Sequence, residues 1–403
     1  MPAKSIVRSS TSSVARISLA LLLAVLLVSP DLALAACTNN SPWIASGATL
    51  TTPIETFGAA VSPTSNGDVM YIIGGEDWTS PTTPVFQTQI LHKSVSAVAT
   101  PNPSTWQFHN DMWKGAAGVP VGFARDLCGV VNNGFLYTIG GVIKDSTISD
   151  ATGNSTAQVW YAPINATNGN LGAWKITNPV PVPMGKMGLQ LHGSVVVTVG
   201  GNTYLYVIGG SNSDHGNGTV NQDITSAVHF VKINLDGSLA LWDHDGNGNP
   251  ATLPDIPSQG VGLYKTCPVV YNGSIYVAGG EAKGMSLNQV VYATPIADGT
   301  FGGIPWNNMT SNYIVIGVTP TPDAAQAVVY NNGIILMGGD EGSNTIVSTV
   351  FQGTVAADKS VMWSTLTSLP LAISRNAGAT SGGHTFSLAG QHAGIDLSCI
   401  YYH

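Results

Sequence analysis

Three basic residues each precede a Gly-Gly or Ala-Gly dipeptide by nearly the same number of residues. Arg125, Lys265 and Arg375 lie 15, 14 and 14 residues before a Gly-Gly or Ala-Gly pair. The chain has only 14 Lys and Arg residues among 403, so three at one spacing are more than chance would place there. Guanidinium and ammonium groups bind carboxylate and sulfate through charge-assisted hydrogen bonds. The spacing therefore predicts a cationic rim that holds a carboxylate, a sulfate or a sugar acid.

Acidic residues directly follow three of the glycine pairs, namely Glu76, Glu281 and Asp340. Two interpretations remain open. In the first, Glu76 and Asp340 join the three basic residues in contacting a ligand. In the second, the three acids neutralise the three basic residues as ion pairs, and the set is structural.

A calcium-loop pattern occurs once, in "DHDGNGNP" at residues 243–250. Asp243, Asp245 and Asn247 supply oxygen ligands at alternating positions, and Gly248 is sixth, which matches the first half of the motif. The twelfth position is Pro254 instead of Glu, and no helix is expected on either side. A polar turn is the competing interpretation. Apart from this calcium ion, we expect no cofactor.

These residues must be positioned by a repeated unit, because two markers recur along the chain. The first marker is a glycine pair that follows an apolar strand, at 51 to 70 residue intervals, the last copy being Ala389-Gly390. Its complete copies begin at Gly74, Gly140, Gly209, Gly279 and Gly338. The second marker is a tryptophan downstream of each of the five complete pairs. Turn residues such as "NNG" and "YNG" divide each unit into four short strands, which predicts antiparallel sheets.

The pattern "YxxGG", followed by an aromatic strand and a Trp, resembles the kelch repeat, including the kelch-type central domain of galactose oxidase. The resemblance covers essentially all of residues 37–403. It implies an all-β, six-bladed β-propeller of four-stranded antiparallel blades in a single domain. The units exceed the roughly 50 residues usual for kelch, and the excess lies mainly in loops after the glycine pairs.

The two ends of the chain are expected to share the last blade. Trp43 has no glycine pair before it, while the sixth unit ends without a Trp. We therefore predict that residues 38–50 supply the outermost strand of the last blade, with a disulfide between Cys37 and Cys399. Acylation of Cys37 within the lipobox-like "LAAC" is the alternative. Cys128 and Cys267 are expected to be free thiols.

Residues 1–36 have a basic start, an apolar run and small residues at the end, as in a secretory signal peptide. We therefore expect a secreted, extracellular or periplasmic protein, or alternatively a surface lipoprotein anchored through Cys37. The net charge of −8 and a charged fraction of 9% argue against nucleic acid as a partner. No later stretch is apolar for long enough to span a membrane.

The loops after the glycine pairs should gather on one face of the ring, where function is expected. The leading hypothesis is a secreted, non-enzymatic binding module for a glycan or an extracellular protein, because no nucleophile, base and orienting group can be placed together. The alternative is a mutarotase or epimerase, since the repeats also resemble exported sialic-acid mutarotases. In that case Glu76, Glu281 or His392 would exchange the proton.

Overall fold

The computed structural model describes residues 37, 42–77, 85–86, 90–100, 105–109, 123–144, 154–212, 223–257, 262–282, 285–308, 325–340, 345–392 and 395–403. The predicted signal peptide lies outside these residues. The regular structure is almost entirely antiparallel strand, with a short helix, α3 (Val95–Val98). The all-β prediction is confirmed. None of the helices in the described residues has the length and hydropathy that crossing a membrane requires.

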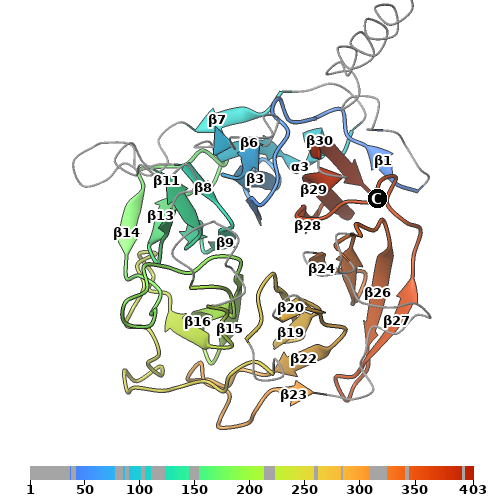
Figure 1. Cartoon of the computed structure of the whole chain (residues 1–403). Helices are drawn as coiled ribbons and strands as arrows, with labels where there is room; N and C mark the ends of the chain where they lie inside the picture. Colours follow the sequence, from blue (N-terminus) through green and yellow to red (C-terminus); the bar gives the residue numbers. More distant parts are fainter. Residues whose placement is uncertain are drawn as a thin grey trace, which may run out of the picture.

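Five four-stranded sheets and one three-stranded sheet, the third in order, follow one another along the described chain (Figure 1). The first contains β2 (Gly58–Ser62), β3 (Val69–Ile73), β6 (Ile90–Ser94) and β7 (Gln107–His109). The second contains β9 (Cys128–Asn132), β10 (Phe135–Ile139), β13 (Val159–Pro163) and β14 (Lys175–Thr177). The third contains β15 (Gly193–Val199), β16 (Asn202–Ile208) and β17 (Val228–Lys232).

The remaining three sheets repeat the same antiparallel order. The fourth contains β18 (Cys267–Tyr271), β19 (Ser274–Ala278), β22 (Val290–Ala293) and β23 (Asn307–Asn308). The fifth contains β24 (Gln326–Tyr330), β25 (Gly333–Met337), β26 (Val350–Val355) and β27 (Val361–Thr365). The sixth contains β28 (Ala377–Ser381), β29 (His384–His392), β30 (Ile395–Tyr402) and β1 (Ile44–Ala45).

The first two strands of most sheets are joined by tight turns that require left-handed backbone. In the turn between β9 and β10, Asn133 and Gly134 have φ of 45° and 76°. In the turn between β18 and β19, Asn272 and Gly273 have φ of 47° and 73°. Such two-residue turns suit Asn and Gly, and their twist matches that of the flanking strands. They set the register that brings each first strand to its place in the sheet.

Burial distinguishes the second strand of a sheet from the first. All residues of β3, β19 and β25 are buried, because each of these strands lies inside its sheet with apolar neighbours on both faces. The first strands β9 and β24 are mostly half-buried. Contacts between first strands join β2 to β9, β9 to β15, β15 to β18, β18 to β24, β24 to β28, and β28 to β2.

Aromatic side chains tie each sheet to the next one. The Trp106 indole donates a hydrogen bond to the Ala48 carbonyl at 2.7 Å, and the Trp242 indole donates one to Asn178 at 3.0 Å. A second set starts from the buried second strands: the Tyr71 hydroxyl donates to Gly169 at 2.6 Å. These bonds satisfy the polar end of a side chain whose ring is buried between sheets. The recurring tryptophans are therefore packing residues.

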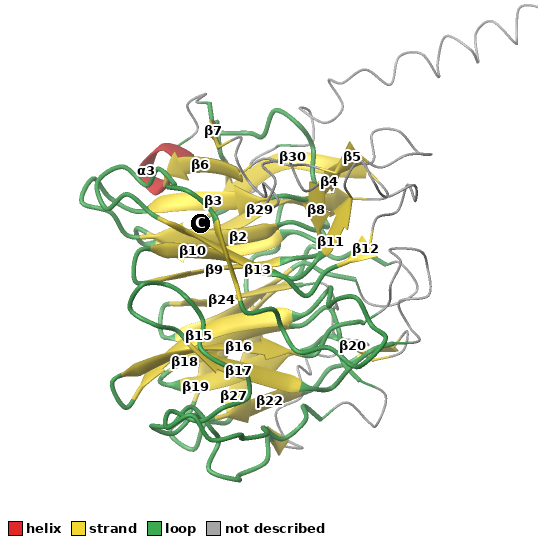
Figure 2. Cartoon of the chain, turned by 90° about the vertical axis from the view of Figure 1, so that its left-hand side faces the viewer, coloured by secondary structure: helices red, strands yellow, loops and turns green. Residues whose placement is uncertain are grey.

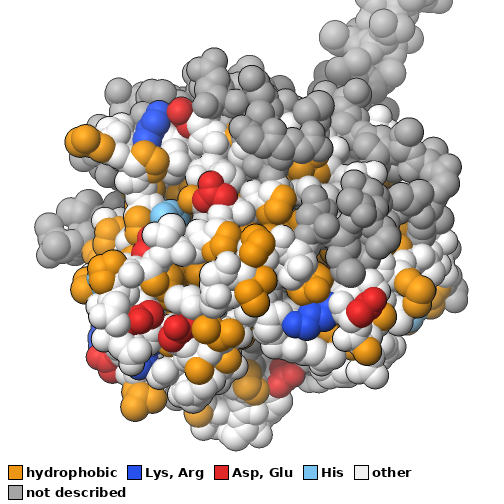
Figure 3. Space-filling model, turned by 90° about the horizontal axis from the view of Figure 1, so that it is seen from below, with side chains coloured by type: hydrophobic (Ala, Val, Ile, Leu, Met, Phe, Trp, Pro, Cys, Tyr) orange, Lys and Arg blue, Asp and Glu red, His pale blue; other side chains and the backbone are white. Residues whose placement is uncertain are grey.

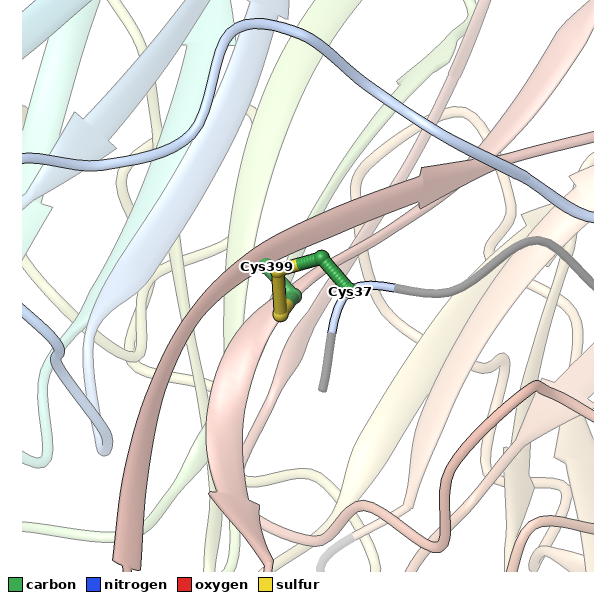
Figure 4. The surroundings of a disulfide bond; sticks show 2 residues. All are labelled: Cys37 and Cys399. Carbon is green, nitrogen blue, oxygen red and sulfur yellow. A yellow bond between two sulfur atoms is a disulfide. The ribbon is translucent and has the colours of Figure 1, made fainter. Parts of the chain in front are cut away.

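The chain ends meet as predicted. Cys37 and Cys399 form a disulfide with a Cα–Cα distance of 5.5 Å (Figure 4). β1 pairs with β30, with Ile44 opposite Tyr402, and so completes the sheet that contains the C-terminus. The disulfide leaves no thiol on Cys37, so the alternative of acylation there is wrong for this structure.

Small strands and loops gather on one side of the molecule. The pairs β4 (Glu76–Asp77) with β5 (Val85–Phe86) and β20 (Glu281–Ala282) with β21 (Met285–Ser286) follow glycine pairs, as does β11 (Val142–Lys144) between β8 (Phe123–Arg125) and β12 (Asn154–Ser155). Figure 2 places these strands on the side opposite α3. One face seen in Figure 3 carries few charged side chains among apolar and uncharged ones. The predicted site cations Arg125, Lys265 and Arg375 lie two or three residues before the first strands of their sheets.

Candidate functional site

A cavity of about 700 Å³ lies among the first strands of the six sheets. Small-molecule sites in proteins commonly measure about 300–1,000 Å³. Every one of the six sheets contributes lining residues at or just before its first strand: Thr56–Ala59, Arg125–Gly129, Gln190–Ser194, Tyr264–Pro268, Gln326–Ala327 and Arg375–Gly378. Glu76, which follows a glycine pair, also lines the cavity. The predicted basic residues Arg125, Lys265 and Arg375 are therefore brought together.

Five residues at one position before the first strands share a strained backbone. Each lies two residues before its strand and has φ between 53° and 55°: Thr56, Asp126, Leu191, Lys265 and Arg375. Left-handed backbone costs a non-glycine residue about 1–2 kcal/mol. Hydrogen bonds between neighbouring members offset this strain, because the backbone amide of Asp126 donates to the Thr56 carbonyl at 2.8 Å and that of Leu191 donates to Asp126 at 3.0 Å. We call these five residues the collar.

The collar corrects the predicted equivalence of the three cations. Lys265 and Arg375 are collar residues, whereas Arg125 stands one place earlier and lies in β8 opposite Val142. The collar position beside it is occupied by Asp126. In the third sheet, the same count of 15 or 14 residues back from Gly209 reaches Ser194 or Val195, but the collar residue is Leu191. The count failed because β15 and β16 each have seven residues, two more than β9 and β10.

Arg125 makes the most buried ion pair of the cavity. Its Nη1 donates to Glu76 Oε1 at 2.6 Å, and its Nε lies 3.6 Å from Asp126 Oδ2. The side chains of Arg125, Glu76 and Asp126 are 10%, 1% and 7% exposed. Thr56 Oγ1 also donates to Glu76 Oε1, at 3.4 Å. A single guanidinium therefore stands between two buried carboxyl groups.

Arg375 pairs with a residue that the sequence did not suggest. Its Nη1 donates to Glu55 Oε1 at 2.8 Å, and Glu55 is fully buried. Asp340, the predicted partner, pairs through its backbone with Ile346 and does not line the cavity. The Arg375 side chain is 42% exposed, more than those of Arg125 and Lys265. Arg375 is the cation best placed to meet a ligand.

Lys265 follows the predicted pairing. Its ammonium lies 2.5 Å from Glu281 Oε2, and the Tyr264 hydroxyl donates to the other oxygen of the same carboxylate. The ammonium also lies 5.3 Å from the centre of the Tyr264 ring, within the range of a cation–π contact. Of the two interpretations of the acidic residues, ion pairing thus holds for Glu76 and Glu281, although both remain beside the cavity cations.

Two carboxyl groups of the cluster are set to change charge near neutrality. Burial raises the pKa of Glu55 to about 7; Arg375 opposes this shift, and Asp396 and Glu76 add to it. Burial likewise raises the pKa of Asp126 to about 6, against the charge of Arg125. Desolvation of a carboxylate favours its neutral form. Asp126 lines the cavity and can exchange a proton there, while Glu55 is fully buried beside it, paired with the cavity residue Arg375.

The raised pKa of Glu55 predicts a pH effect on stability. A carboxyl that binds its proton more tightly in the folded state stabilises the fold below its unfolded pKa, and this stability is lost as the pH rises. For Glu55 the loss falls between about pH 4.5 and 7. We expect Glu55→Gln, which mimics the neutral acid, to gain stability relative to the wild type between pH 5 and 8. Urea unfolding at several pH values measures this; a constant difference would contradict it.

The two free thiols also line the cavity, as structural groups. Cys128 Sγ donates to the His192 carbonyl at 2.8 Å, and Cys267 Sγ donates to the Ala325 carbonyl at 2.6 Å. Each bond joins a first strand to the next sheet. Burial raises the pKa of Cys128 to about 12 and that of Cys267 to about 11. Thiols with such values are poor nucleophiles, and the prediction that both are free is confirmed.

The remaining predicted site residues lie elsewhere. Asp243 accepts hydrogen bonds from His229 and from the Phe230 amide, while Asp245 accepts the amides of Asn247 and Asn249 within its own turn. This favours the polar-turn interpretation. No group of three or more His, Cys, Asp or Glu in the described residues is arranged to hold a metal ion.

His392, the third residue of the catalytic alternative, points elsewhere too. Its Nδ1 lies 2.7 Å from the Ala372 carbonyl, and it does not line the cavity. Asp126, Glu55 and Tyr264 were missed by sequence reasoning. The signal for Asp126 was present, since it lies 14 residues before Gly140, the same count as Lys265 and Arg375.

Comparisons with known proteins do not assign the site. No protein-family model matches the chain, and no curated protein matches it. What the site can do is therefore inferred from its geometry.

Proposed function

We propose that the chain is a kelch-like, six-bladed β-propeller that acts as a secreted binding module and takes a sugar unit of a glycan into the cavity at the collar. The six sheets would be the blades, and the contacts between their first strands would surround the central channel. β1 would close the last blade with the help of the disulfide. A disulfide is compatible with an exported protein.

The observation that carries the binding proposal is the convergence of charged side chains from several sheets on one cavity. Sugar hydroxyls both donate and accept hydrogen bonds. Among the residues that line the cavity, Arg375 and Lys265 are donors of hydrogen bonds for such hydroxyls, and Asp126 and Glu76 are acceptors. The polar groups are held by ion pairs and strained backbone, so they need little reorganisation when a ligand arrives. These features fit a preformed site for a small polyhydroxylated molecule.

Titration with a panel of neutral, acidic and amino monosaccharides, followed by isothermal calorimetry, tests this proposal. We expect at least one class to bind, and Arg375→Gln to weaken that binding about tenfold or more, because a charge-assisted hydrogen bond contributes about 1.5–3 kcal/mol. Lys175→Gln is the matched control, since Lys175 is an exposed residue of β14. Equal effects of the two variants, or no binding of any sugar, would overturn the proposal.

A mutarotase remains the second candidate, favoured by the two carboxyl groups that titrate near neutrality. Ring opening of a sugar needs an acid and a base whose pKa values lie near the working pH. Asp126 fits this requirement in the cavity, in place of His392. Nuclear magnetic resonance of sugar anomerisation decides between the two: acceleration that is lost in Asp126→Asn supports the enzyme, and no acceleration supports the binding module.

A further inference from the structure

The charge balance of the cavity works against a simple anion site. Three cations face it or lie beside it, and each has a carboxylate partner: Glu76 for Arg125, Glu281 for Lys265 and Glu55 for Arg375. Asp126 is a fourth carboxyl group, which shares Arg125 with Glu76. When all seven groups are ionised, the cluster carries one net negative charge. An anionic ligand would then meet cations whose charge is already neutralised.

Asp126 differs from the other three acids in its contacts. Its carboxylate lies 3.6 Å from Arg125 Nε, which is longer than an ordinary hydrogen bond. Its side chain is 7% exposed and lines the cavity at a collar position. The charges of Arg375 and Lys265, on two other sheets, also act on it. Asp126 therefore occupies the place among three cations that a ligand carboxylate would need.

We propose that the cavity binds a small monocarboxylate together with one proton from solvent, which Asp126 takes up so that the ligand's carboxylate replaces its negative charge among Arg125, Lys265 and Arg375. No bond other than the new O–H bond forms. This inference rests on the proposed function and specifies the ligand class for the same site. It explains how cations that are paired in the free protein serve an anionic ligand.

The groups around Asp126 allow it to accept this proton. Arg125 and Glu76 lie beside it, and Arg375 and Lys265 act across the cavity. Burial raises the pKa of Asp126 to about 6, so protonation near neutrality costs little.

The remaining titratable neighbours are placed differently from Asp126. Glu55 is the second group able to accept a proton, but it is held by Arg375 and does not line the cavity. Glu281 and Tyr264 hold Lys265. His192 stays neutral, because burial lowers its pKa to about 3.

Calorimetry with D-galacturonate, and with D-galactose as its neutral counterpart, tests the inference. We expect the dissociation constant for galacturonate to rise about tenfold per pH unit above pH 6, as one coupled proton requires. At pH 7.5, titrations in two buffers of different ionisation enthalpy should show uptake of about one proton per galacturonate. Galactose binding should show no uptake.

Asp126→Asn provides the decisive variant, because Asn tolerates left-handed backbone and keeps the shape of the neutral acid. We expect it to bind galacturonate at pH 8 as tightly as the wild type does at pH 5, without proton uptake. Asp223→Asn is the control, since Asp223 is 34% exposed and pairs with Lys186; it should keep the wild-type pH dependence.

The possible results separate this inference from the proposed function. If galacturonate binds with no proton uptake, or Asp126→Asn keeps the pH dependence, the inference is wrong and the binding module stands. If only neutral or amino sugars bind, the ligand class is wrong while the proposed function stands. If no sugar binds at any pH, the proposed function is overturned and the inference falls with it.

Discussion

Replacing both Cys37 and Cys399 with serine should lower the free energy of unfolding by about 3–5 kcal/mol. The disulfide joins residues 362 positions apart, and long closed loops restrict the unfolded chain most in the chain-entropy description. Without it, the N-terminal segment keeps only non-covalent contacts: the pairing of β1 with β30, backbone hydrogen bonds to Ser398 and Ile400, and the hydrogen bond from Trp43 to the Thr367 carbonyl. Guanidinium unfolding followed by tryptophan fluorescence measures the loss.

Cys128→Ser is the matched control for that variant. Serine keeps a donor for the bond to the His192 carbonyl, so the loss should be about 1 kcal/mol or less. Unfolding of the double variant at the same denaturant concentration as the wild type would show that the chain ends are held by other contacts.

Arg125→Met should cost about 3–5 kcal/mol at pH 8, because it leaves Glu76 and Asp126 as buried carboxylates without their cation. The cost should shrink at pH 5, where the unpaired acids can take up protons. Unfolding in urea at both pH values measures the loss in the free energy of unfolding at each pH. The pH dependence separates a lost charge from lost packing, since packing would cost the same at both.

Lys186→Met is the comparison, since Lys186 pairs with Asp223 at 2.9 Å while both side chains remain about one-third exposed. Exposed pairs contribute roughly 0–1 kcal/mol, so this variant should lose less than about 1 kcal/mol at either pH. A similar loss in both variants would mean that the cavity pair is as well solvated as the surface pair.

The sequence by itself determined the features that depend on neighbouring residues. Alternating apolar strands and Asn-Gly turns specify hairpins locally, so the all-β class could be predicted. The positions of Cys37, Trp43 and Cys399 at the two ends made the shared last sheet predictable, and the structure confirms their pairing. The propeller itself stays a prediction.

Only the tertiary structure decided which charges meet in the cavity. Arg375 pairs with Glu55, 320 residues away, and Arg125 pairs with Glu76, 49 residues away, on another sheet. Counting from the glycine pairs selected Arg125, one residue before the collar position. The longer β15–β16 hairpin moved Leu191 outside the counted distance. Hairpin length sets where each first strand begins, and burial between sheets sets which carboxyl group keeps its proton. Both are properties of the packed sheets, which no local pattern records.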